Sequence, residues 1–176
     1  CNLSSINLIH FLNEDGTFKT KDFLHAVDIM ILAQEILVGN SSYPTPLIEK
    51  NAHDYRQLGL GFTNLGGLLM SKALVYDSDS ARAWAGSITA LMSGEAYRLS
   101  SVIASRMGVY AGYEKNKEPQ LNVIGMHREK VKEINSKFLD DKKLYSAASE
   151  VWNDAFSAAK KYGVRNSQVT VIAPTG

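Results

Sequence analysis

The C-terminal stretch of the chain combines the pattern of a buried strand with a turn. Val169–Ile172 is a run rich in β-branched residues, which is typical of a strand covered on both faces. Pro174 ends backbone pairing, and Thr175 and Gly176 follow with a small side chain and a freely turning backbone. Backbone N–H groups in such a turn bind anions well when a helix begins directly afterwards. The stretch therefore predicts a strand that leads into a candidate anion-binding turn.

The size and charge of the chain favour one globular unit. It has 176 residues, of which 45% are hydrophobic, and a formal net charge of +1. Charges of both signs are mixed along the chain, which argues against nucleic-acid binding through bulk charge. No long apolar run or signal-peptide pattern occurs, so we expect no membrane association. The single cysteine, Cys1, excludes an internal disulfide framework and indicates a reducing, cytoplasmic setting.

Helical patterns occupy most of the chain between two short strands. Apolar spacing and capping residues predict helices over 21–38, 48–53 and 80–107, a loop over Val109–Glu118, a helix opened by Pro119 that leads to Phe138, and a last helix that ends at Gly163. The helix over 21–38 is apolar nearly all round, so we expect it to be buried inside something larger than itself. The strands, one at Leu3–Ile9 and one at the C-terminal end, need partners that we expect to be largely missing from this sequence.

Four glycines lie close together in the middle of the chain, at positions 59, 61, 66 and 67. Their spacing does not match the Gly-x-Gly-x-x-Gly dinucleotide fingerprint, and no β-branched strand precedes them. Glycines beside leucines at helical spacing favour close helix packing. We therefore expect this stretch to be a packed helix and not a nucleotide site.

Glu95 lies on the apolar stripe of the helix over 80–107, four residues from both Leu91 and Leu99. It is either a catalytic carboxylate or the partner of Arg98 or of a neighbouring helix end, and pairing is the favoured interpretation. The four histidines have no partners at metal-ligand spacing and are expected to be structural: His10, His25, His53 and His127.

Cys1 is followed by small and polar residues, Asn2, Ser4 and Ser5, which suit a wet and reactive position. A single free cysteine, taken alone, is more often an inert small hydrophobe. The interpretation of Cys1 therefore depends on the motifs elsewhere in the chain.

Four motifs cover the chain in order. They are Cys-Asn-Leu-x-Ser-x-Asn-Leu at 1–8, Arg-x-Leu-Gly-Leu-Gly-x-x-Asn-Leu-Gly-x-Leu-Leu-Met at 56–70, Tyr-Asp-Ser-Asp-x-x-Arg-Ala-Trp-Ala at 76–85, and Arg-Asn-Ser-Gln-Val-Thr-Val-Ile-Ala-Pro-Thr-Gly at 165–176. Together they resemble the large catalytic chain of ribonucleotide reductases. The Ala-Pro-Thr-Gly ending and Gly-Glu-Ala-Tyr at 94–97 are most similar to the adenosylcobalamin-dependent (class II) branch.

This resemblance implies an α/β fold class and a radical reaction. Residues 1–176 would be a partial catalytic barrel domain, a mostly helical internal fragment of a ten-stranded α/β barrel with a strand at each end. In this family, the ribonucleoside-diphosphate reductases of the thioredoxin-disulfide type, a thiyl radical removes the 3′ hydrogen of a ribonucleotide and the 2′ hydroxyl leaves as water. A pair of cysteines then supplies two electrons and closes to a disulfide.

The resemblance also assigns residues and partners. Cys1 matches the second member of the redox pair, and Pro174, Thr175 and Gly176 match the start of the phosphate-binding loop. The other redox cysteine and the Asn-x-Cys-x-Glu cluster that bears the radical do not occur in this sequence, so we expect the isolated chain to be inactive. The implied partners are a ribonucleotide, a thioredoxin-like reductant, the remainder of the same chain and a second copy in a homodimer. Adenosylcobalamin would be contacted mainly by residues outside this sequence.

The two ends suggest an internal piece of a larger protein. Protein splicing needs Cys, Ser or Thr directly after an intein, and the phosphate loop is a known insertion site in this family, so the chain could lie between two interrupted sites. A truncated or partial gene would give the same ends. Two other interpretations stay open: the metal-dependent (class I) branch of the same family, and a non-catalytic helical interaction module.

Overall fold

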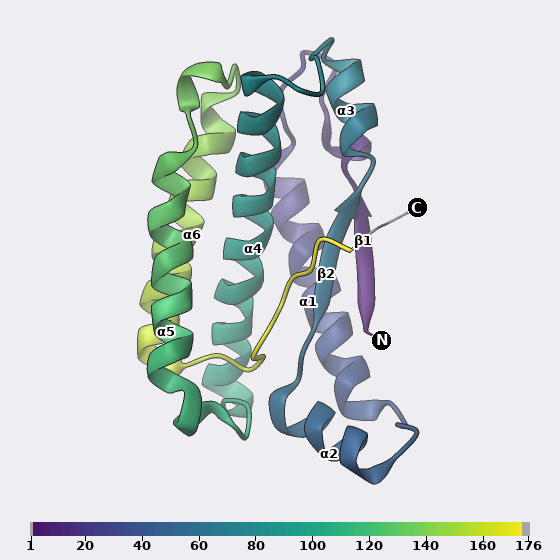
Figure 1. Ribbon diagram of the computed structural model, residues 1–176, viewed down its shortest axis with the longest axis vertical. Helices are drawn as coiled ribbons and strands as arrows, with labels where there is room; N and C mark the ends of the chain where they lie inside the picture. Colours follow the sequence, from purple (N-terminus) through teal and green to yellow (C-terminus); the bar gives the residue numbers. More distant parts are fainter. Residues whose placement is uncertain (1, 174–176) are drawn as a thin grey trace.

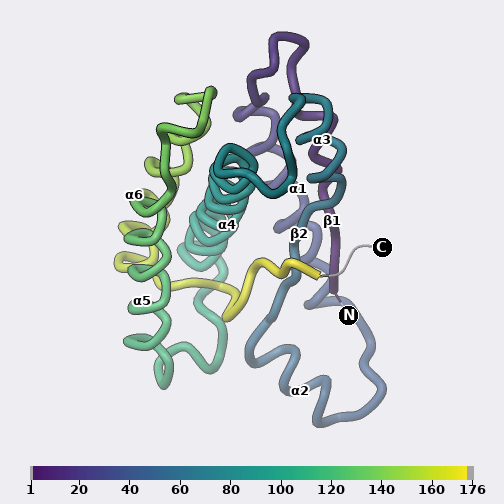
Figure 2. Tube along the Cα trace, turned by 45° about the horizontal axis from the view of Figure 1, so that its top comes forward, coloured from purple at the N-terminus to yellow at the C-terminus, as the bar shows by residue number. Residues whose placement is uncertain are grey.

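The structure is a computed structural model, and it describes residues 2–173 (Figure 1). Its helices and strands are, in chain order, β1 (Leu3–Asn7), α1 (Thr20–Asn40), α2 (Pro46–Tyr55), β2 (Gly59–Thr63), α3 (Leu65–Ser71), α4 (Asp79–Met107), α5 (Tyr113–Lys130) and α6 (Lys142–Tyr162), with short 3-10 turns at Leu8–Phe11, Val131–Glu133 and Ser136–Phe138. The long helix α4 lies in the middle of the molecule. Helices α5 and α6 cover one side of it, and the two strands with α1 cover the other (Figures 1 and 2).

The core between α4 and α6 is apolar and closely packed. Ala148, Trp152 and Ala155 of α6 are buried, and the Trp152 ring centroid lies 6.1 Å from that of the buried Tyr97 of α4. Gly94 allows the close approach of the two helices, because a Cβ atom at this position would lie 2.7 Å from the Val151 side chain. Shape complementarity therefore fixes this interface.

Helix α1 is apolar on two opposite sides, as the sequence predicts. Its inner side buries Phe23, Val27 and Ile31 completely. Its outer side carries three exposed aliphatic side chains, Ile29, Leu32 and Ile36. The inner side therefore belongs to the core of this chain, while the outer side forms an apolar surface.

The predicted helices α1, α2, α4 and α6 are present with ends shifted by a few residues at most. The Ser78 hydroxyl accepts a hydrogen bond from the backbone N–H of Ala81 at 3.1 Å, which caps α4. Gly108 and Gly163 follow α4 and α6 with φ values of +79° and +71°, which favour glycine. Capping chemistry thus placed these ends correctly.

The prediction around Pro119 is wrong. Pro119 does not open a helix but lies inside α5, which begins at Tyr113, so the predicted loop before it is shorter. Both Pro119 and Lys115 are exposed, and water can bond to the carbonyl that the proline leaves without a helical partner. The helix also does not reach Phe138: it ends at Lys130 and is followed by two 3-10 turns.

The prediction for the glycine stretch is also wrong in its first half. Gly59–Thr63 is strand β2, and only Leu65–Ser71 is helical. Strand β2 runs parallel to β1 in a register that pairs Leu3 with Gly59 and Asn7 with Thr63. The two glycines of β2 are two residues apart, which places both on the same face of the strand.

Strand β1 has its partner inside this chain, contrary to expectation, whereas the predicted C-terminal strand forms a single bridge. β1 pairs along one edge of β2, and Thr170 forms a parallel bridge with Leu60 on the other edge. Residues 168–173, which we call the C-terminal segment, add backbone bonds from Leu58 N–H to the Gln168 carbonyl at 2.9 Å and from Val171 N–H to the Leu60 carbonyl at 2.9 Å. The C-terminal segment joins β2 through this one bridge and is not a full strand.

Candidate functional site

The C-terminal segment crosses over β2 toward β1, and the glycines of β2 make this crossing possible. A Cβ atom on Gly61 would lie 2.5 Å from the backbone oxygen of Val171, and one on Gly59 would lie 2.2 Å from the Leu3 side chain and 3.0 Å from that of Val171. Any larger residue at position 61 would therefore push the backbone of the segment away. Both views show the described end of the chain passing β2 to the side where β1 begins (Figures 1 and 2).

Asn2, at the start of β1, is held by three hydrogen bonds from two different elements. Its side-chain amide donates to the backbone carbonyl of Gln34 in α1 at 2.7 Å. Its own carbonyl accepts from the Gln34 Nε2 at 3.0 Å and from the backbone N–H of Gly59 at 3.1 Å. Gln34 is 1% exposed, so its side of these bonds is shielded from solvent. The backbone directly after Cys1 is therefore fixed against both α1 and β2.

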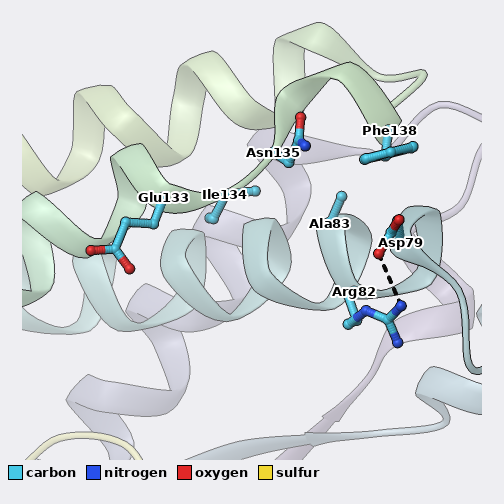
Figure 3. A pocket seen from close by; sticks show the side chains of 7 residues that line it. All are labelled: Asp79, Arg82, Ala83, Glu133, Ile134, Asn135 and Phe138. Atoms are coloured by element: carbon cyan, nitrogen blue, oxygen red, sulfur yellow. Dashed lines mark hydrogen bonds and ion pairs between the residues drawn. The ribbon is translucent and has the colours of Figure 1, made fainter.

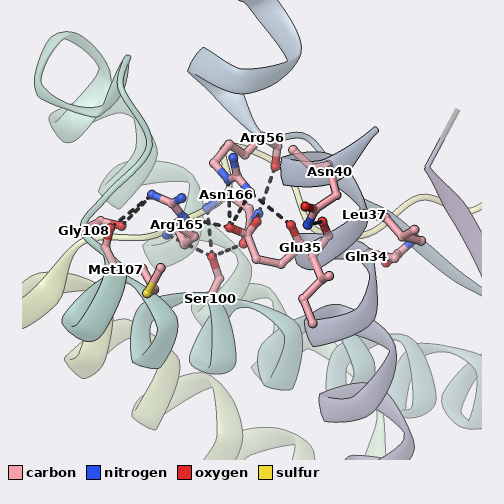
Figure 4. A network of polar contacts seen from close by, with 12 residues as sticks. Gln34, Glu35, Leu37, Asn40, Arg56, Ser100, Met107, Gly108, Arg165 and Asn166 are labelled. Carbon is pink, nitrogen blue, oxygen red and sulfur yellow. Dashed lines mark hydrogen bonds and ion pairs between the residues drawn. The ribbon is translucent and has the colours of Figure 1, made fainter. Parts of the chain in front are cut away.

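The next residue of α1, Glu35, is the centre of a buried polar cluster, which we call the Glu35 network: Glu35, Arg56, Ser100, Arg165 and Asn166 (Figure 4). The Glu35 Oε1 accepts from Arg56 Nε and from Arg165 Nε, each at 2.8 Å, and the Oε2 accepts from Asn166 Nδ2 at 2.6 Å. The one carboxylate thus contacts both guanidinium groups and the Asn166 amide, so the buried negative charge is fully compensated inside the protein.

The Glu35 network fixes Arg165 and Asn166, the residues that lead into the C-terminal segment. The Ser100 hydroxyl of α4 donates to Asn166 Oδ1 at 2.8 Å and accepts from the Asn166 backbone N–H at 3.0 Å. The Asn166 Nδ2 also donates to the Arg56 carbonyl at 3.0 Å, and Asn166 is fully buried. Further along, the Ser93 and Thr170 hydroxyls lie 3.3 Å apart. Helices α1 and α4 together therefore position this part of the chain.

Sequence reasoning missed Gln34 and Glu35 as functional candidates. Both lie within the apolar pattern of α1, where a buried polar residue gives no periodic signal of its own. Two adjacent polar residues in a helix that is otherwise apolar nearly all round, together with the Arg-Asn-Ser-Gln motif that Glu35 contacts, were the available signal.

Two asparagines meet at the carboxyl ends of the parallel strands. Asn64 Nδ2 donates to Asn7 Oδ1 at 3.1 Å, which joins the residue that ends β1 to the residue that follows β2. Asn64 has a left-handed backbone with φ of +66°, which asparagine tolerates better than most residues. Ligands of parallel sheets bind outside the carboxyl ends of the strands, so this edge is chemically suited to a polar ligand.

Glu95 pairs with Arg98, which confirms the favoured interpretation. Arg98 Nε donates to Glu95 Oε2 at 2.8 Å, and its Nη2 lies 3.5 Å from Asp28 Oδ1 of α1. Burial, and then the hydrogen bond and charge of Glu95, raise the pKa of Asp28 to about 7. The group joins α1 to α4.

No metal site is formed by residues 2–173: no three His, Cys, Asp or Glu side chains gather there. The described part of the chain also has no helix long and apolar enough to cross a bilayer. A cavity of about 300 Å³ lies at the start of α4, lined by Asp79, Arg82, Ala83, Glu133, Ile134, Asn135 and Phe138 (Figure 3). Arg82 is already paired there with Asp79 at 2.9 Å, and the cavity lies away from the strands.

The residues that the sequence predicted for the site, Cys1, Pro174, Thr175 and Gly176, lie outside the described residues. The structure brings together their described neighbourhoods instead. These are the Asn2 contacts at the start of β1 and the C-terminal segment that crosses β2.

Comparison with known proteins identifies the family of this chain. A family model described as "Ribonucleotide reductase, barrel domain" matches residues 1–176. The chain is 48% identical over 178 residues to a vitamin B12-dependent ribonucleotide reductase of Rhodopirellula baltica, a match that covers 100% of this chain and 17% of the relative. It is 43% identical to a protein of the same description from Streptomyces coelicolor, again over 100% of this chain and 19% of the relative.

A more distant relative is the ribonucleoside-diphosphate reductase subunit alpha of Chlamydia pneumoniae, which is 29% identical over 99% of this chain and 16% of the relative. The chain thus spans less than a fifth of the length of these curated relatives. Since the family model matches every residue, the chain belongs to the ribonucleotide reductase barrel-domain family.

Proposed function

We propose that this chain contributes part of the active site of a vitamin B12-dependent ribonucleotide reductase. Cys1 is one of the two cysteines that supply the reducing electrons, and Pro174–Gly176 begin the loop that binds the substrate phosphates. The main support is the crossing at Gly61, which carries the C-terminal segment over β2 toward the strand that begins beside Cys1.

In the proposed reaction, a thiyl radical outside this chain removes the 3′ hydrogen of the ribonucleotide. The 2′ hydroxyl gains a proton and leaves as water, and two thiols supply two electrons and two hydrogens as they form one disulfide. One of these hydrogens protonates the leaving hydroxyl and the other ends on C2′. The abstracted hydrogen then returns to C3′, which regenerates the thiyl radical. Cys1 provides one sulfur, and the second cysteine lies outside these residues. A thioredoxin-like dithiol then reduces the disulfide by exchange.

The phosphate role of Pro174–Gly176 follows from the chemistry of the turn. Small residues after a strand leave backbone N–H groups accessible, and such groups bind phosphate when a helix begins beyond them. The preceding C-terminal segment runs parallel to β1 and β2 at the Leu60–Thr170 bridge. Asn7 and Asn64 place additional amide groups at the carboxyl ends of the neighbouring strands.

Adenosylcobalamin is the cofactor that the names of the relatives imply for the full-length enzyme. The described residues do not form a site for it. The cavity of about 790 Å³ beside the start of α1 has mixed walls, with Phe18 and Leu24 beside charged residues such as Asp15 and Lys143, and nothing in this lining identifies a corrin site. We therefore assign no cobalamin contact to this chain and derive no step through the cofactor.

For the full-length protein we propose a cytoplasmic homodimer that acts on ribonucleotides. The class I branch is the second candidate, because the Chlamydia pneumoniae relative is named as a subunit alpha. Activity of the full-length enzyme with adenosylcobalamin and without a second subunit would favour class II. A strict requirement for a second subunit would exclude it.

The role of Cys1 is tested by Cys1→Ser in the full-length enzyme, with Ser4→Ala as the control. We expect Cys1→Ser to abolish turnover supported by a thioredoxin-like reductant, and we expect bound ribonucleotide to slow alkylation of Cys1 in the unmodified enzyme. Undiminished turnover by Cys1→Ser would refute the proposal. Absence of any protection by nucleotide would instead favour a non-catalytic helical module.

A further inference from the structure

We propose that Gln34 and Glu35, two consecutive buried residues of α1, are positioning residues that set the spacing between the two halves of the active site. Gln34 holds the chain beside the reducing cysteine, and Glu35 holds the chain that leads to the phosphate loop. This inference rests on the proposed function, because it assigns each half of the site to one of these two residues.

Gln34 acts on the cysteine side. Its Nε2 donates to the Asn2 carbonyl at 3.0 Å, and its backbone carbonyl accepts from the Asn2 side chain at 2.7 Å. Because the Nε2 must face that carbonyl, the amide orientation is fixed. The Oε1 is then buried, with no hydrogen-bond partner among residues 2–173. Leaving such an acceptor unpaired costs about 1–3 kcal/mol, a cost that an apolar residue of similar size would avoid. A side chain needed only to fill space would not be a glutamine.

Glu35 acts on the phosphate side. Its carboxylate bonds Arg165 at 2.8 Å and Asn166 at 2.6 Å, directly before the C-terminal segment. The Arg165 Nη1 also reaches the carbonyls of Met107 and Gly108, each at 3.3 Å, which ties the same residue to the end of α4. The position of the C-terminal segment therefore depends on the Glu35 carboxylate.

The Gln34 contact with Asn2 and the Glu35 contacts with Arg165 and Asn166 are coupled, because both residues lie in one turn of α1. Consecutive residues of an α-helix are 1.5 Å apart along its axis and point about 100° apart around it. A shift of α1 would therefore move the chain beside Cys1 and the chain before Pro174 together. Catalysis between two groups is sensitive to such spacing, since a displacement of about 1 Å can cost roughly 100-fold in rate.

The cysteine side is tested by Gln34→Met in the full-length enzyme, with Gln57→Met as the control. Methionine keeps the length and removes both polar atoms, and Gln57 is an exposed glutamine at which the same change is made. We expect Gln34→Met to lower kcat roughly 10- to 100-fold, to change KM little, and to alter the alkylation rate of Cys1 in the folded enzyme, read from the Cys1 peptide after digestion. We expect Gln57→Met to match the unmodified enzyme in all three.

The phosphate side is tested by Arg165→Lys, which keeps the charge near Glu35 but loses the reach to the carbonyls at the end of α4. We expect KM for the ribonucleotide to rise about tenfold while kcat and the Cys1 alkylation rate change little. The essential result is this contrast: Gln34→Met lowers kcat with little change in KM, and Arg165→Lys raises KM with little change in kcat. Equal losses in kcat for both variants that follow the loss of folded protein, measured by thermal unfolding, would overturn the inference and leave a structural role only.

Cys1→Ser separates this inference from the proposed function. If Cys1→Ser keeps turnover, the proposed function fails, whatever the other variants do. If Cys1→Ser is inactive but Gln34→Met and Arg165→Lys behave like the unmodified enzyme, the proposed function stands and the positioning roles are refuted.

Discussion

The α4–α6 interface and the region around β2 are held together by different forces. Between α4 and α6, the large side chains of Tyr97 and Trp152 are buried against each other, and Gly94 brings the backbones close. Around β2, the contacts that join the separate pieces of chain are polar: Gln34 with Asn2, and Glu35 with Arg56, Arg165 and Asn166. One region is fixed by shape and the other by directional bonds.

This difference agrees with the role of each region: the α4–α6 interface stabilises the fold, and the contacts around β2 fix one arrangement of the chain. Apolar packing gives much of the stability of a fold but tolerates small adjustments. Buried hydrogen bonds to charged groups contribute less net stability, but they are strongly unfavourable when broken and so permit one arrangement. The polar bonds are found where the chain approaches both proposed catalytic parts. Changes in the two regions should therefore separate stability from activity.

The largest effect is expected from Glu35→Gln. It removes the charge that pairs with two guanidinium groups in a buried place, and breaking a buried ion pair costs about 3–5 kcal/mol. Unfolding of the full-length enzyme by urea measures this loss. The same change at the exposed Glu49 of α2 should leave stability within error. Equal effects at the two positions would show that the Glu35 network does not hold this region together.

A smaller loss of stability with a large loss of activity is expected from Gly61→Ala. The new Cβ would lie 2.5 Å from the Val171 backbone oxygen, and a backbone atom cannot turn away as a side-chain tip can. Overpacking of this kind costs about 1–3 kcal/mol. We expect KM for the ribonucleotide to rise because the C-terminal segment is displaced. Gly66→Ala is the control, since its Cβ would meet no heavy atom within 4 Å outside its chain neighbours and the backbone of its own helix.

Gly94→Ala should show the reverse of Gly61→Ala: a loss of stability without a loss of activity. Its Cβ would lie 2.7 Å from the Val151 side chain, so α4 and α6 would separate slightly and stability would fall by about 1–3 kcal/mol. The kcat and KM of the protein that stays folded should not change. Gly86→Ala in the same helix meets Ile134 only at 3.5 Å and should be neutral or slightly stabilising. A selective loss of kcat in Gly94→Ala would contradict the separation of the two regions.

The smallest effect is a pH dependence at the contact between α1 and α4. The pKa of Asp28 is raised from 3.8 to about 7, chiefly by burial and then by Glu95. The folded state therefore holds a proton that the unfolded state releases between these values. This contribution to stability is present below about pH 4 and is lost as the pH rises through 7. Asp28→Asn should flatten the fall in melting temperature between pH 5 and pH 8. An unchanged slope in this variant would assign the proton to another group.

Much of the helical fold could be predicted because its signals are local. Ser78 caps α4 by bonding the Ala81 backbone, and Gly108 and Gly163 adopt positive φ values directly after α4 and α6. Each of these effects depends on residues a few positions apart. The pairing of Glu95 with Arg98 is equally local, because the two lie three residues apart on one helix.

The errors have non-local causes. Gly59 and Gly61 are poor strand formers, and only contacts with distant parts of the chain explain why glycine is needed in β2: Leu3 and Val171 at Gly59, and the Val171 backbone at Gly61. Pro119 is a common helix opener, and it is tolerated inside α5 because it lies on an exposed face. The contacts of Gln34 and Glu35 span 32 and 131 residues. Such long-range contacts cannot be read from periodicity.

The separation along the chain between Glu35 and Asn166 also has a consequence for biosynthesis. Their bond closes a loop of 131 residues, whereas α1 itself can form from neighbouring residues alone. Contacts with long loops form late in folding, because the entropy of closing the loop must be overcome first. A ribosome must therefore release nearly all of this sequence before the Glu35 carboxylate finds Arg165 and Asn166, and a nascent chain that stalls earlier leaves this carboxylate with Arg56 alone.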